Sequence, residues 1–179
     1  MVLLKAVLAE MPNYAMSYIN CPLMNLDPQI PAKASALYTD AAWNNTSLAG
    51  GLGWVSTKAD GSVLFKGTED RRNVASALLA EAMALKTALS EAVSHCITDI
   101  ICFSDSKCLI DLITGKKTVV ALQGLLHDLG VLSDSCKSIS FCFIPRGRNK
   151  VADSLAKNAM FHMSNNPCGV SHSVVNSVT

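Results

Sequence analysis

The fold is decided by residues 37–67, which read LYTDAAWNNTSLAGGLGWVSTKADGSVLFKG. Short strand-forming runs stand at 37–42, 50–57 and 62–67. The last two are joined by Ala59-Asp60-Gly61, a sequence typical of a tight turn. Because consecutive strands at this spacing usually pair as neighbours, the segment predicts an antiparallel meander.

The order of the later elements extends this prediction to a whole fold. Asn73 is a candidate N-cap for a long helix that runs to about His95. The pattern further predicts an apolar strand at 99–104, helices at 106–114 and 119–132, a strand at 138–144 and a last helix at 150–163. A meander followed by strand–helix units is typical of an α/β fold with a mixed sheet between helices.

One domain is expected, over residues 37–162. Residues 1–36 contain four prolines and no sustained period, which favours a leader or linker. Residues 163–179 are rich in Ser, Asn and Val, which favours a loose C-terminal tail. Half of the 179 residues are hydrophobic, so the composition excludes a disordered chain.

The net charge and the cysteine pattern limit how the chain can contact nucleic acid and in which cellular compartment it is expected. The net charge is +1, so any contact with nucleic acid must come from a local basic patch. The seven cysteines include no Cys-x-x-Cys pair, which excludes the common zinc motifs and favours a reducing intracellular compartment, nucleus or cytoplasm. No stretch predicts a membrane span, and the apolar run at 1–8 is short for a signal peptide.

Two acidic residues stand where a structural role does not explain them well. Asp40 lies inside the first predicted strand, although aspartate is disfavoured in strands. Glu81 lies between Leu78 and Leu85 on the apolar stripe of the long helix. An unpaired carboxylate that faces a core costs on the order of several kcal/mol. Both positions therefore need a reason, such as a partner or a bound metal ion.

Two further acids lie at the ends of predicted elements. Asp105 follows the strand 99–104, at the place where open α/β sheets bind ligands, and Asp153 lies in the first turn of the last helix. Taken singly, each acid has an ordinary alternative. Asp40 could be a turn residue at the end of its strand, and Glu81 could lie at the edge of the apolar stripe and reach solvent. Asp105 could cap the helix that follows it, and Asp153 could be an acid favoured by the dipole at the start of its helix.

The conjunction of the four acids predicts a metal site. Two strands and two helices each bring one carboxylate toward the same end of the sheet. Clustered acids raise one another's pKa, and divalent cations relieve their repulsion. Ligands that are all oxygen suit Mg²⁺ or Mn²⁺ and not Zn²⁺. Two such ions about 4 Å apart can activate water for phosphodiester cleavage.

The same positions carry motifs that resemble those of a known family, type 1 ribonuclease H. The matching segments, in the correct order, are YTDAAW at 38–43 with AGGLGWV at 49–55, AEAMAL at 80–85, FSDS at 103–106, and IPRGRNKVADSLAK at 144–157. The chain most resembles the plant ribonuclease-H-like domains that are related to reverse transcriptases of non-LTR retroelements.

The resemblance implies a five-stranded mixed sheet, made of a three-stranded antiparallel meander and two parallel strands, flanked by helices. It implies that two Mg²⁺ ions, for which Mn²⁺ can substitute, are held by the catalytic residues Asp40, Glu81, Asp105 and Asp153. The implied activity is endonucleolytic hydrolysis of the RNA strand of RNA–DNA hybrids, leaving a 3′-hydroxyl and a 5′-phosphate. No obligate protein partner is expected, and the chain is expected to act as a monomer.

The sequence departs from the family pattern in two places that bear on turnover. Many members carry a histidine in the loop before the last helix, but residues 145–149 contain none. Arginine in that loop can hold phosphate but is a poor proton shuttle because it stays charged. The basic handle that some members use to grip the hybrid is reduced to Gly115-Lys116-Lys117.

Candidate contacts to the hybrid are few. The densest basic cluster consists of Arg146, Arg148, Lys150 and Lys157, and it could hold backbone phosphates. An equal alternative is that these residues are only the solvated start of a helix. Asn44 and Asn45, with Thr46, are candidates for the minor groove, although an ordinary polar turn is the more common case. Trp43 and Trp54 are expected in the core.

Two alternatives to a hybrid nuclease stay open at this point. One is a weak or inactive nucleic-acid-binding module derived from a retroelement ribonuclease H domain. The other keeps the fold but changes the chemistry, because related folds serve as exonucleases and integrases. The segment RNKVAD at 148–153 favours ribonuclease H over the second alternative.

Overall fold

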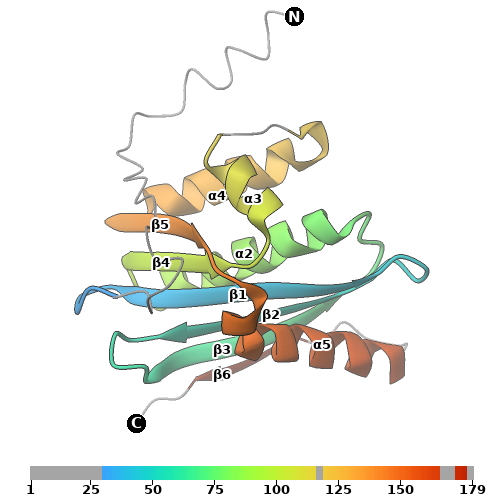
Figure 1. Ribbon diagram of the computed structural model, residues 1–179, viewed down its shortest axis with the longest axis horizontal. Coiled ribbons are helices and arrows are strands. Elements are labelled where there is room, and N and C mark those ends of the chain that lie inside the picture. Colours follow the sequence, from blue (N-terminus) through green and yellow to red (C-terminus); the bar gives the residue numbers. More distant parts are fainter. Residues whose placement is uncertain (1–29, 116–118, 166–171, 177–179) are drawn as a thin grey trace, which may run out of the picture.

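The described part of the chain folds into one mixed sheet with helices on both faces, as the computed structural model in Figure 1 shows. The structure describes residues 30–115, 119–165 and 172–176. Its strands are β1 (Ser35–Asn44), β2 (Ala49–Thr57), β3 (Val63–Arg71), β4 (Asp99–Ser104), β5 (Ser138–Phe143) and β6 (His172–Asn176). Its α-helices are α2 (Ala77–Ser94), α3 (Lys107–Ile113), α4 (Gln123–Asp134) and α5 (Lys150–Asn165).

The strand order is β5-β4-β1-β2-β3-β6. The pairs β1–β2 and β2–β3 are antiparallel, whereas β1–β4 and β4–β5 are parallel, so the predicted meander and the two parallel strands are confirmed. The last parallel pair joins Thr39 to Ser104. Beyond Thr39, no residue of β4 pairs with β1, so the edge of β1 on the β4 side is not covered by a strand at Asp40.

The two helical layers differ in how they pack on the sheet. Helices α2, α3 and α4 lie over one face and α5 over the other (Figure 1). The fully buried Trp54 reaches the α2 layer, where its indole N–H donates to Glu91 at 3.0 Å. The partly buried Trp43 packs against the same core, so the core assignment of both tryptophans is confirmed.

Glycine in β2 lets α5 approach the sheet at backbone distance. A Cβ on Gly53 would lie 2.6 Å from the carbonyl oxygen of Ala152 and would collide with the backbone nitrogen of Ala156. Gly51 is equally crowded by the backbone of α5. Because Asp153 and the loop before it belong to α5 or adjoin it, this contact also sets the position of part of the candidate site.

The structure corrects the start of the long helix. The N-cap of α2 is Ser76, whose hydroxyl accepts the N–H of Leu79 at 3.1 Å, and not Asn73. Asn73 has a φ of 57°, which is left-handed backbone and cannot begin a helix. The next residue, Val74, is tied to the β1–β2 loop by its N–H to the oxygen of Leu48. The helix can begin only after this anchor.

The expected domain ends also need correction. The expected loose tail at 163–179 is wrong for two of its segments, because α5 runs to Asn165 and β6 pairs with β3 as a sixth strand beyond the expected five. Residues 166–171 and 177–179 lie outside the described ones. An open edge such as that of β3 readily pairs with a short strand, and Val174 and Val175 suit one. The boundary at 36/37 is also too late, since β1 begins at Ser35; residues 1–29 lie outside the described ones.

The first prediction concerns the contact between β2 and α5. Gly53→Ala should lower the free energy of unfolding by about 2 kcal/mol or more, because backbone atoms cannot move aside as a side chain would. Thermal unfolding measures this. Gly124→Ala is the matched control: Gly124 is in α4 with open space around it, and the change should stabilise by up to about 1 kcal/mol. Equal effects of the two substitutions would contradict the packing described here.

Candidate metal centre

Three of the predicted acids meet where the parallel strand β4 ends. Asp40 lies on β1 just past the last β4 pair, Asp105 follows β4 directly, and Glu81 comes from the second turn of α2. One carboxylate oxygen of each lies within 4.8 Å of the other two. Asp40 is buried, at 3% exposure, and the other two are partly buried. This cluster of Asp40, Glu81 and Asp105 is called the acidic triad below.

Two members of the triad, Asp40 and Glu81, hold their protons more strongly than usual when no cation is present. Burial, followed by the charges of Asp105 and Asp153, raises the pKa of Asp40 to about 7. Burial, followed by the charges of Asp40 and Asp105, raises the pKa of Glu81 to about 9. One oxygen of Glu81 is buried without a hydrogen-bond partner. Divalent cations with oxygen ligands, Mg²⁺ or Mn²⁺, fit this donor set.

The geometry rejects the ordinary explanations for the triad residues. Asp40 lies within β1 and not at a turn, and Glu81 turns a buried oxygen inward. The cap position of α3 is Ser106, and Asp105 instead accepts a hydrogen bond from Asn149. None of the three carboxylates is therefore explained by local structure alone.

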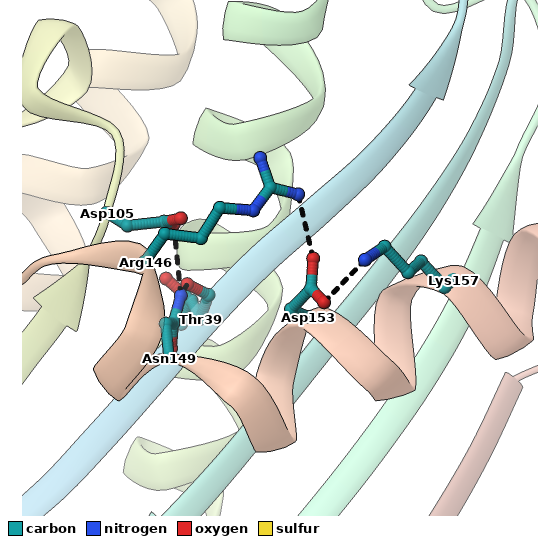
Figure 2. Close-up of polar contacts among 6 residues, drawn as sticks. All are labelled: Thr39, Asp105, Arg146, Asn149, Asp153 and Lys157. Carbon is teal, nitrogen blue, oxygen red and sulfur yellow. Dashed lines mark hydrogen bonds and ion pairs between the residues drawn. The ribbon is translucent and has the colours of Figure 1, made fainter.

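Asn149 is the residue that the sequence analysis missed. Its side chain, 1% exposed, donates to the carbonyl oxygen of Thr39 at 2.8 Å and to Oδ1 of Asp105 at 3.1 Å (Figure 2). One amide thus joins β1, the end of β4 and the start of α5. An asparagine just before a helix is usually a cap, so only its burial, which no local pattern reveals, distinguishes this role.

Asp153 is not part of the triad. Its Oδ1 accepts from Arg146 at 2.8 Å and its Oδ2 from Lys157 at 2.6 Å (Figure 2). Hydrogen bonding from Lys157, followed by that from Arg146, holds the pKa of Asp153 below its ordinary value, against the effect of burial. Asp153 is still close enough for its charge to contribute to the raised pKa of Asp40.

The predicted nucleic-acid contacts that the structure describes are all exposed, and of these Arg146 is close enough to the triad to feel the charges of Asp40 and Asp105. Arg146, Arg148 and Lys150 are exposed on the short 3₁₀ turn at 146–148 and the start of α5. Asn44 accepts the N–H groups of Thr46 and Ser47, which favours its alternative role as a turn residue. Asn45 is exposed in the same turn and accepts the hydroxyl of Thr46 at 3.3 Å. Lys116 and Lys117 lie outside the described residues.

An acidic triad at the end of β4, in a sheet of order β3-β2-β1-β4-β5 between helices, defines a ribonuclease-H-like domain. Residues 38–159 match the family described as reverse transcriptase-like, and the chain belongs to that family. No curated protein matches the chain. Among the described residues, none of the helices has the length and apolar character that crossing a membrane requires.

Solved structures of RNase H1 enzymes share the fold. RNase H1 from the halophilic archaeon Halobacterium salinarum is 26% identical, with a TM-score of 0.69 over 72% of this chain and 98% of that one. The N-terminal RNase H domain of a Mycobacterium tuberculosis protein is 26% identical, with a TM-score of 0.69 over 75% and 99%. LC11-RNase H1, isolated from compost and solved in complex with RNA/DNA hybrid, is 21% identical, with a TM-score of 0.67 over 73% and 99%.

The second prediction is that the metal-free protein loses stability as the pH rises. The folded pKa values of Asp40 and Glu81, about 7 and about 9, exceed their ordinary values of 3.8 and 4.5. The folded chain then binds more protons than the unfolded chain, so the free energy of unfolding falls between about pH 4 and pH 9. The melting temperature measured in EDTA should therefore decline as the pH rises across this range. The increase in melting temperature that Mg²⁺ causes should become larger as the pH rises.

Glu81→Gln provides the control for this pH dependence, because it removes the group with the larger shift. Its melting temperature in EDTA should vary less with pH than that of the wild type. A wild-type melting temperature that rises with pH over the window, or an unchanged slope in Glu81→Gln, would contradict the raised pKa values.

The third prediction concerns Asn149. Asn149→Ala should lower the free energy of unfolding by about 2 kcal/mol, because it leaves the carbonyl of Thr39 and one oxygen of Asp105 without their buried donor. Asn158→Ala, at an exposed position in α5, should change it by less than about 0.5 kcal/mol. Chemical denaturation of both variants in EDTA makes the comparison. Similar values for the two would show that Asn149 does not join the strands to α5.

Proposed function

We propose that this domain hydrolyses the RNA strand of RNA–DNA hybrids endonucleolytically, with divalent cations bound at the acidic triad. The observation that carries the proposal is the triad itself: three carboxylates from separate elements lie within 4.8 Å of one another, and no local structure explains them. Membership of the reverse transcriptase-like family and the shared fold with RNase H1 enzymes support this choice of reaction. The complex of LC11-RNase H1 with RNA/DNA hybrid supports the choice of substrate.

The residues of this chain would contribute in distinct ways. Asp40, Glu81 and Asp105 would hold the cation, and Asn149 would fix the orientation of Asp105 through its hydrogen bond. When bound, Mg²⁺ or Mn²⁺ supplies a Lewis acid that activates water and stabilises the leaving oxygen. Arg146, Arg148 and Lys150, exposed at the 3₁₀ turn and the start of α5, would hold backbone phosphates, with Arg146 nearest the triad.

The loop at 145–149 contains no histidine that could donate a proton to the leaving group. The two arginines of this loop cannot serve as the acid, because an arginine side chain does not readily give up its proton. We propose that solvent supplies this proton, which makes slow turnover the expected behaviour. The same loop, together with the ion pairs of Asp153, favours the second candidate, a nucleic-acid-binding module with weak or no catalysis.

The fourth prediction separates the two candidates. The chain is incubated with labelled RNA–DNA hybrid, duplex DNA and duplex RNA, in Mg²⁺, in Mn²⁺ and in EDTA. We expect cleavage of the hybrid alone, in either metal but not in EDTA. Asp105→Asn should lower the rate by at least about 100-fold because it removes a metal ligand, while its melting temperature in EDTA is unchanged or higher because one repelling charge is gone.

Other outcomes of this experiment would contradict the nuclease or the role of the triad. Hybrid binding without cleavage in either metal at high protein concentration would support the binding module and refute the nuclease. Cleavage that persists in EDTA or in Asp105→Asn would show that the triad is not the catalytic centre. A large loss of stability in Asp105→Asn would show instead that Asp105 has a structural role.

A further inference from the structure

Asp153 is the one of the four predicted acids that lies outside the triad. Each of its oxygens has its own cation: Arg146 on Oδ1 at 2.8 Å and Lys157 on Oδ2 at 2.6 Å (Figure 2). Lys157 stands four residues later on α5, a spacing that places both side chains on one face of the helix. Arg146 reaches the same carboxylate from the 3₁₀ turn before α5. Asp153 is therefore bridged from two directions.

These contacts oppose the binding of a metal ion by Asp153. Each carboxylate oxygen already accepts a hydrogen bond from a cationic side chain, and two positive charges more than balance the single negative charge. The Arg146 guanidinium is also close enough to Asp40 and Asp105 for their charges to act on it, so it adds positive charge at the edge of the triad. A second divalent cation at Asp153 would have to displace or oppose these two side chains.

We propose that Arg146 and Lys157 take the place of a second divalent cation at Asp153, so that the free chain binds one divalent cation, at the triad. The proposal rests on the proposed function, because it assumes a cation site at the triad. It departs from the two ions that the family resemblance implies. Both cationic side chains are largely exposed, at 71% for Arg146 and 57% for Lys157. Exposed ion pairs are weak, so the two cations bias occupancy and do not block it absolutely.

The experiment counts bound ions directly. Metal-free protein is titrated with Mn²⁺, and free Mn²⁺ is measured by electron paramagnetic resonance. The wild type is compared with Arg146→Met/Lys157→Met, which removes both cations and keeps two unbranched side chains. The control is Lys58→Met/Lys137→Met, which removes the same charge. Both control residues are exposed and lie at the end of the sheet away from Asp105, after β2 and before β5.

The wild type and the control should bind one Mn²⁺ per chain, with any second ion at least tenfold weaker. Arg146→Met/Lys157→Met should bind the second ion about tenfold more tightly than the wild type does, as the loss of two exposed ion pairs suggests. Two ions of similar affinity in the wild type, an unchanged double variant, or an equal gain in the control would each overturn the proposal and leave the proposed function standing. No Mn²⁺ binding by the wild type would overturn both.

Discussion

Repulsion among three carboxylates, brought within 4.8 Å of one another at the end of β4, is the constraint around which the rest of the structure is arranged. Burial adds to it, because Asp40 and Glu81 have little water to stabilise their charged forms. A bound cation would favour the charged forms of these two carboxylates. The fold tolerates this local cost because the surrounding strands and α2 are fixed by an extensive apolar core that does not involve the acids.

The position of α5 is the second requirement, and it depends on features distant from the triad in sequence. Gly51 and Gly53 allow the backbone of α5 to lie directly on β2, and Asn149 then reaches Thr39 and Asp105 from the start of the helix. The same placement brings Asp153 near Asp40 without bringing it into the triad. A shift of α5 would therefore alter both the support of Asp105 and the electrostatic field at Asp40.

Sequence patterns predicted the core of the fold and the triad because both leave local signals. Alternating strands, a tight turn, and acids placed in a strand, on an apolar stripe and after a buried strand are all visible in the chain itself. What they could not show depends on tertiary contacts. Examples are the left-handed backbone at Asn73, the pairing of β6 with a distant edge, and the burial of Asn149. The ion pairs of Asp153 belong to the same class: the spacing to Lys157 is readable, but the approach of Arg146 from another element is not.

The central claim is that the acidic triad holds protons that a divalent cation displaces. Isothermal titration of the protein with Mg²⁺ at pH 7, in two buffers of different ionisation enthalpy, measures the protons released on binding. With Asp40 at a pKa of about 7 and Glu81 at about 9, the account predicts release of about one proton or more per chain. The same heat of binding in both buffers would show that no proton leaves, and would contradict the account.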